Sequence, residues 1–319
     1  MIAVCIIVAC LCAGAAAVAA TPMKDLVVCR QDNTSTGFIE KIDAKSGDLI
    51  QESDTPPFVF SWPHVEMTAD SNTADVYVVT FPDGYPGPVL YQLDHNLKQI
   101  YAWENAPITF FDLQYSPAQK AMYGILVTTS YGRALSNFTL DQPNDSITAQ
   151  QLYTLPYMWY VNASSFDAPN SRYFALINNF PGFDNSTLEQ QLIVADFSLE
   201  AAPVVGLFPV SSKGMVQFLS YSQEREALYW AGSVSGLARV GIMDQGTTEV
   251  VFERPAIAVG PLMVVPTATG DEVTVFIQTA AQPPVWELWA LDAQHEGRVV
   301  GRYLGDRFTV IAGATTSSK

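Results

Sequence analysis

The feature that most constrains the fold is a strand-like segment that recurs six times and ends each time at an aspartate. Each copy alternates or runs apolar before the aspartate, whose side chain accepts a backbone N–H two residues on and closes a tight turn. The spacings between successive aspartates are 51, 47, 55, 48 and 48 residues. The aspartates are Asp43, Asp94, Asp141, Asp196, Asp244 and Asp292. The chain is therefore predicted to contain six units of about fifty residues, each with a strand that ends in a hairpin.

Three further strand-like segments accompany each repeat. One with a recurrent tyrosine precedes it, as at Tyr77 and Tyr229, a third segment follows it, and a fourth leads into the next unit. No segment after the first twenty residues shows a helical apolar period over ten or more residues. Because a four-stranded sheet with two apolar faces is stable only between neighbours, the pattern predicts an all-β, six-bladed β-propeller with four antiparallel strands per blade.

The two ends of the chain are predicted to meet in one blade. The chain opens at Leu26 with a strand of the second type, and its end supplies the missing strand of the first type. That strand closes the ring and covers an open sheet edge. A β-sandwich is the alternative, but it does not predict this circular arrangement. The predicted organisation is a leader at 1–20 and one propeller domain at 21–319, with blades at 25–56, 57–106, 107–155, 156–212, 213–256 and 257–306 and a closing strand at 307–313.

Composition argues against two classes of partner. The 319 residues include 32 acidic and 16 basic side chains, which gives a net charge of −16. Such a chain repels nucleic-acid phosphates and anionic lipids, and no basic stripe offsets the repulsion. Charged residues make up only 15% and hydrophobic residues 49%, which indicates a globular protein with a large core. We expect no nucleic-acid binding and, after leader cleavage, no membrane binding.

The first twenty residues carry no charge and end in small residues near Ala19 and Ala20, which is typical of a secretory signal peptide. An uncleaved anchor is an alternative because the run lacks a basic start and is about long enough to span a bilayer. A lipoprotein cleavage box at 7–10 is another. Cleavage leaves Cys29 as the single cysteine, so no intrachain disulfide is expected and its apolar surroundings predict a buried thiol. The predicted location is extracellular, or the lumen of the secretory pathway.

Five N-x-S/T sequons follow the leader, at Asn33, Asn137, Asn144, Asn162 and Asn185. Together with the leader they are typical of an extracellular glycoprotein that carries sugar on surface loops. Glycans are predicted at Asn33, Asn137, Asn144 and Asn185. Asn162 is excepted because it falls inside a predicted strand.

The innermost strands of a propeller surround a central channel, so polar residues at matching positions on them converge. Counting from the tyrosine of the following strand places His64, Asp112 and Asn162 on three consecutive inner strands. Such residues are candidates for catalysis, for binding a cation or for holding a sugar hydroxyl, with Asp112 and Asn162 as the candidate metal ligands. The alternative is that they hydrogen-bond neighbouring strands or water.

A second candidate site is one rim of the ring. Two long connections, 81–88 and 178–187, combine aromatic residues, proline, glycine and aspartate. Aromatic side chains there are candidates for stacking on a sugar ring or anchoring a protein; the alternative is that they fold onto the blade ends. The predicted rim residues are Tyr85, Tyr157, Trp159, Phe180 and Phe183.

The strand, aspartate and turn in KIDAKSGDLI (41–50) and LWALDAQHEGRVV (288–300) resemble the blades of quinoprotein-like (PQQ-like) and YVTN-type propellers. The resemblance extends from about Leu26 to Gly313 as a style of blade. It implies the fold and no particular activity. The tryptophan docking repeat of true quinoprotein dehydrogenases is absent from the sequence.

The chain also resembles six-bladed lactonases and gluconolactonases, which implies a central Ca²⁺ bound by Glu, Asp and Asn of several inner strands. Asp112 and Asn162, with Glu66 at the margin, are the matching residues, fewer than the six to eight oxygens that Ca²⁺ prefers. Nucleophile-elbow, zincin and phosphate-loop motifs are absent from the sequence.

The combined expectation is a monomeric, secreted glycoprotein that acts as a binding or scaffold propeller for a protein or carbohydrate partner, without a cofactor and without enzymatic activity. The alternative is a metal-dependent hydrolase of the lactonase type that uses the central channel and Ca²⁺.

Overall fold

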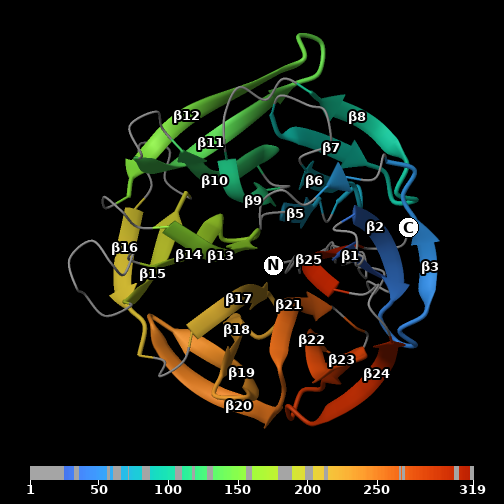
Figure 1. Cartoon of the computed structure of the whole chain (residues 1–319). Coiled ribbons are helices and arrows are strands. Elements are labelled where there is room, and N and C mark those ends of the chain that lie inside the picture. The colour runs from blue at the N-terminus through green and yellow to red at the C-terminus, as the bar shows by residue number, and fades with distance from the viewer. Residues whose placement is uncertain are drawn as a thin grey trace, which may run out of the picture.

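The computed structural model describes residues 25–31, 36–55, 58–59, 66–70, 72–80, 87–104, 110–116, 119–127, 132–155, 160–178, 189–197, 204–211, 215–265, 267, 270–304 and 309–316. Strands and turns account for these residues, and they contain no helix long and apolar enough to cross a membrane. The strands form six antiparallel sheets around a common axis (Figure 1). This arrangement confirms the predicted all-β, six-bladed propeller. The predicted leader lies outside the described residues.

Each sheet is one blade, and its strands take four positions from the axis outward. The innermost strands are β25 (Thr309–Thr316), β5 (Glu66–Ala69), β9 (Phe110–Ser116), β13 (Tyr160–Asp167), β17 (Met215–Ser222) and β21 (Ala258–Val265). The second strands are β1 (Asp25–Gln31), β6 (Val76–Thr80), β10 (Ala121–Val127), β14 (Arg172–Asn178), β18 (Ala227–Val234) and β22 (Glu272–Ala281).

The third position of each blade holds the strand that leads into one of the six repeated aspartates. The third strands are β2 (Thr36–Asp43), β7 (Val89–Leu93), β11 (Arg133–Asp141), β15 (Gln190–Asp196), β19 (Leu237–Asp244) and β23 (Pro284–Leu291). The outermost strands are β3 (Leu49–Glu52), β8 (Gln99–Trp103), β12 (Ser146–Thr154), β16 (Val204–Pro209), β20 (Thr247–Pro255) and β24 (Gly297–Leu304), and a short β4 (Phe58–Val59) pairs with β2. We number the blades 1 to 6 from the sheet that contains β1.

The first blade combines the two ends of the described chain. Strand β25 pairs antiparallel with β1, with Asp25 opposite Thr316 and Gln31 opposite Thr309. It also contacts the innermost strands of both adjacent blades, β21 and β5. Strand β25 thus occupies the innermost position of blade 1, three residues further along the chain at its end than the predicted closing strand.

Six hydrophobic clusters form the core, and each joins residues of two neighbouring blades. Between blades 6 and 1, for example, Leu26 and Val28 of β1 pack with Phe276 of β22 and Leu288 of β23. The apolar residues that alternate along each strand therefore serve the blades on both sides. This is the physical reason why the repeat forms a ring.

Cys29 lies in one of these clusters, between blades 1 and 2. The thiol is free and fully buried, as its apolar surroundings predict.

The repeated aspartates close their turns as predicted. Asp94 accepts hydrogen bonds from the backbone N–H groups of Asn96 (2.8 Å) and Lys98 (2.9 Å), and Asp43 and Asp292 each accept two in the same manner. Asp141 accepts from the N–H of Asn144, three residues on, at 3.3 Å, and residues 198–203 after Asp196 lie outside the described residues. The turn after Asp244 differs, because Gln245 and Gly246 both adopt positive φ (46° and 83°). Such a two-residue turn is compatible with strand twist and needs no side-chain acceptor.

Candidate functional site

The structure describes part of the predicted site. Asp112 lies on β9 and Asn162 on β13, the innermost strands of blades 3 and 4, and for Asn162 only the backbone is described. His64 lies outside the described residues. So do the predicted rim residues Tyr85, Tyr157, Trp159, Phe180 and Phe183, and the rim remains a prediction.

Among the predicted glycosylation sites, Asn144 lies in the exposed turn between β11 and β12. Asn137 lies within β11, half-buried and paired with Tyr123 on one side and Gln150 on the other. Asn33 and Asn185 lie outside the described residues.

Several innermost strands contain a β-bulge, that is, one residue more than the second strand they pair with. The bulges follow the first two residues of each strand, so they lie at nearly the same height along the axis of the ring. In β13, Val161 and Ala163 pair with consecutive residues of β14 and leave Asn162 unpaired. Gln217 of β17 and Ile311 of β25 are unpaired in the same way, and β9 and β21 each place two residues opposite one. A bulge of this kind interrupts the ladder and re-aims a side chain.

Asp112 belongs to the bulge of β9, where Asp112 and Leu113 oppose Gly124 alone. Its φ of 55° is in the left-handed region, which aspartate tolerates better than most residues. The next blade holds its carbonyl oxygen, which accepts hydrogen bonds from the Ser164 hydroxyl at 3.0 Å and the Tyr173 hydroxyl at 2.9 Å. Blade 4 therefore stabilises the unusual backbone of blade 3.

The Asp112 side chain is half-buried. Burial raises the pKa of the Asp112 carboxyl to about 7, against the opposing influence of the Arg133 guanidinium. The group therefore exchanges its proton near neutral pH. A carboxyl with this property is suited to donating a hydrogen bond or to acid–base chemistry.

Other polar side chains of the innermost strands tie neighbouring blades together. Thr68 Oγ1 accepts from the backbone N–H of Tyr115 (3.1 Å), Ser165 Oγ from Tyr221 (2.9 Å) and Ser220 Oγ from Val264 (3.0 Å). These three pairs join blades 2 to 3, 4 to 5 and 5 to 6.

Between blades 3 and 4, Gln114 Nε2 donates to Ser164 Oγ at 3.0 Å. The four contacts are hydrogen bonds between neighbouring inner strands, the role that the sequence offered as the alternative for His64, Asp112 and Asn162, but they are made by other side chains of these strands.

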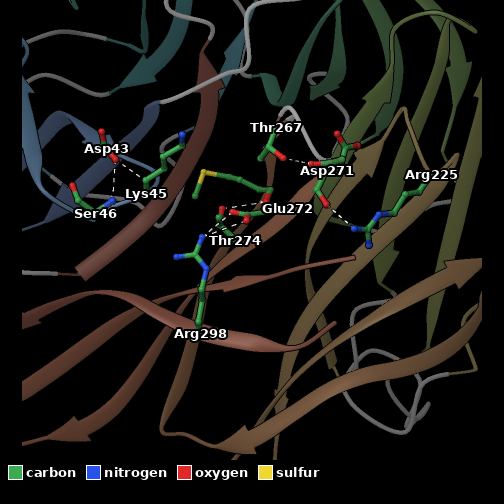
Figure 2. A network of polar contacts seen from close by, with 11 residues as sticks. Asp43, Lys45, Ser46, Arg225, Thr267, Asp271, Glu272, Thr274 and Arg298 are labelled. Atoms are coloured by element: carbon green, nitrogen blue, oxygen red, sulfur yellow. Dashed lines mark hydrogen bonds and ion pairs between the residues drawn. The ribbon is translucent and has the colours of Figure 1, made fainter. Parts of the chain in front are cut away.

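A second polar cluster lies at the junction of blades 5 and 6. Figure 2 shows Arg225 directed at Asp271, whose carbonyl oxygen it binds at 2.6 Å, and Arg298 beside Glu272 on β22. Arg225 also donates to Tyr229 Oη (2.7 Å), and His295 Nε2 lies 3.3 Å from the same oxygen.

His295 is therefore half-buried, whereas its position in an outer turn predicts exposure. Burial, and then the Arg225 guanidinium, lower the pKa of the His295 imidazole. Within the described part of the chain, no three His, Cys, Asp or Glu side chains lie close enough together to hold a metal ion.

Counting along the sequence missed Gln217, Ser164 and Tyr173. In blade 5 the count from Tyr229 reaches Phe218, whereas the unpaired residue of the bulge is Gln217, one residue earlier. Tyr173 recurs in the sequence with Tyr77, Tyr123 and Tyr229. It lies one residue nearer the start of its strand than Tyr123 does, and it packs in one cluster with Tyr123 of the adjacent blade.

The fold defines the chain as a six-bladed β-propeller with bulged inner strands. No family model and no curated protein sequence matches it. Several solved structures are similar to the chain. TolB from Acinetobacter baumannii superposes with a TM-score of 0.56 at 12% identity, covering 92% of this chain and 67% of that one.

Two further structures show the same architecture. A chain from the nidogen/laminin complex gives a TM-score of 0.58 at 7% identity, covering 92% of this chain and 99% of that one. The periplasmic gluconolactonase PpgL from Pseudomonas aeruginosa gives 0.52 at 14% identity, with 88% and 82% covered. At these identities the similarity establishes the fold alone. The quinoprotein-like style of the blades stays a prediction.

Proposed function

We propose that this chain is a secreted, N-glycosylated binding propeller that presents one rim to a protein or carbohydrate partner. The observation that carries the proposal is the use of the inner polar side chains: Thr68, Gln114, Ser165 and Ser220 bind the next blade. These groups stabilise the ring. A rigid ring is a preorganised platform that loses little conformational entropy when a partner docks.

The partner is expected to be neutral or basic, because a net charge of −16 repels acidic surfaces. A chain of the nidogen/laminin complex shares the fold over 99% of its own length. The similarity supports protein binding by analogy. The uncharged leader and the sequons support secretion, and Asn144 is the sequon whose described surroundings are most accessible.

The test is expression of the full chain in secreting eukaryotic cells. We expect the protein in the medium, with a loss of mass on glycosidase treatment that shrinks by one glycan in Asn144→Gln. On glycan arrays and extracellular-protein arrays, Tyr85→Ala with Phe183→Ala should abolish binding, whereas the aromatic change Tyr153→Ala on outer strand β12 should not. Retention in the cytosol, or binding that survives loss of both rim aromatics, would contradict the proposal.

The alternative function is a metal-dependent hydrolase of the lactonase type. One observation favours it: Asp112, with its pKa raised to about 7 by burial, is suited to acid–base catalysis. The described residues do not fit Ca²⁺ well, since no three acidic, His or Cys side chains among them lie together, whereas Ca²⁺ prefers six to eight oxygens. Lactone or ester hydrolysis that is lost in Asp112→Ala and on chelation would establish this activity in place of the binding function.

A further inference from the structure

Among the five innermost strands with a described bulge, those of three consecutive blades include a polar residue in the bulge. In three consecutive blades, 3 to 5, the bulges contain Asp112, Asn162 and Gln217. In blades 6 and 1 they contain Pro261 and Ile311. Consecutive innermost strands are in contact around the axis, so the three polar residues belong to neighbouring strands at nearly one level.

Gln217 carries a buried polar atom that is unsatisfied among the described residues. Its Oε1 is buried and has no hydrogen-bond partner among the described residues. The adjacent backbone is held in place, because Gln190 accepts from the Val216 N–H at 3.2 Å and donates to the Val216 carbonyl at 3.3 Å. A buried amide oxygen without a partner is unfavourable, and a hydrogen bond from a bound polar group would offset this cost.

Asn178 repeats this feature beside Gln190, to which it is paired across β14 and β15. Its side chain is fully buried, and neither Oδ1 nor Nδ2 has a partner within the described part of the chain. Asn178 of blade 4 and Gln217 of blade 5 therefore both have buried side-chain atoms without a hydrogen-bond partner among the described residues. Gln190 lies between them, because it pairs with Asn178 and hydrogen-bonds Val216, the neighbour of Gln217.

We propose that blades 3 to 5 form, at the level of the bulges of β9, β13 and β17, a binding site that includes Asp112 and Gln217 and takes a small neutral polyhydroxylated ligand, either a monosaccharide or a cyclitol. This site is made of inner-strand residues, none of which belongs to the rim set of the proposed function.

The chemistry of the residues selects this class of ligand. Amides offer both donors and acceptors, as hydroxyl groups do, and the carboxyl oxygens of Asp112 accept hydrogen bonds from hydroxyl groups. One carboxyl is too few for Ca²⁺. Its ionised form, together with the net charge of −16, disfavours an anion.

The experiment uses the full chain and ligand-observed NMR with D-glucose, D-galactose, D-mannose and myo-inositol, each alone. Sodium gluconate and calcium chloride serve as charged probes. At least one neutral probe is expected to bind. Gln217→Leu should weaken that binding about tenfold or more, the effect of removing one well-placed hydrogen bond in a buried site. Asp112→Asn, which keeps a donor and an acceptor, should weaken it far less.

The matched control is Gln142→Leu, the same change in the exposed turn before β12, which should leave binding unchanged. Thermal unfolding establishes that each variant is folded. If Gln217→Leu does not fold, Gln217→Glu replaces it and should also weaken binding. Failure of every neutral probe, binding that is insensitive to Gln217, or binding of calcium or gluconate instead would overturn the inference. The rim variants of Tyr85 and Phe183 should retain this binding, so the two proposals fail separately.

Discussion

Asp112 shows how a neighbouring blade holds the backbone of one residue. Its left-handed backbone costs about 1 kcal/mol or more in isolation, and the hydroxyls of Ser164 and Tyr173 hold it by binding its carbonyl oxygen. The carboxyl is then kept in surroundings that favour its neutral form. Strain in the backbone and a displaced pKa at one residue are the marks of a functional position.

The raised pKa has a consequence for stability. The folded protein binds the Asp112 proton more tightly than the unfolded chain between about pH 4 and about pH 7. The protonated Asp112 carboxyl therefore contributes to the free energy of unfolding at low pH, and this contribution is lost as the pH rises through 7. Asp112→Asn should remove this loss, so that the melting temperature of the variant exceeds that of the wild type by several degrees at pH 8 but not at pH 4.

Thermal unfolding across this range is the measurement. Asp145→Asn is the control, because Asp145 also has a left-handed backbone (φ 47°) but lies in an exposed turn. An equal pH dependence in wild type and Asp112→Asn would show that the carboxyl is not held neutral.

At this scale the sequence identifies Asp112 and Asn162 as inner-strand residues, because the recurrent tyrosines give a reference for counting. It does not identify Gln217 or the half-buried His295. A bulge adds a residue without any change in the apolar pattern. The burial of His295 arises from Arg225 and Tyr229, which are about 70 residues away along the chain.

At the scale of elements, the aspartate turns are predicted well because their chemistry is local. Asp43, Asp94 and Asp292 accept the backbone N–H groups that the motif predicts. Asp244 shows the limit of the motif, since its turn is closed by the backbone conformation of Gln245 and Gly246. One sequence signature thus serves two kinds of turn.

These two kinds of turn should respond differently to the same substitution. Asp94→Ala removes the acceptor for Asn96 and Lys98 and should lower the free energy of unfolding by about 1 kcal/mol. Asp244→Ala should change it by less than about 0.5 kcal/mol, as for most surface changes. Chemical denaturation measures both, and equal losses would mean that the aspartates act through something other than their turns.

At the scale of the whole molecule, stability resides between the blades. All six hydrophobic clusters span two sheets, and side chains of inner strands bind the backbone of the next blade. The ring follows from the sequence because six similar units with two apolar faces have few other ways to bury them. The individual ties between blades do not follow from it, because a serine or threonine at one position of a strand carries no signal of its partner.

Removal of residues 305–319 tests how far the ring depends on β25. The truncated chain leaves the inner edge of β1 without its partner and should be aggregated or misfolded, because an unpaired strand edge seeks other chains. Size-exclusion chromatography and circular dichroism are the measurements, and removal of 317–319 alone is the control. A monomeric truncated protein with an unchanged melting temperature would show that β25 contributes little.

The pairing of β25 with β1 also determines how the protein responds to mechanical force. Asp25 and Thr316 lie opposite each other at one end of the pair, so tension applied through the two ends of the described chain loads its hydrogen bonds one after another, as in opening a zipper. Tension applied across the rim instead loads whole interfaces between blades at once. If the proposed rim holds a partner, we expect the protein to sustain through that partner a force that would open the ring when applied through the chain ends.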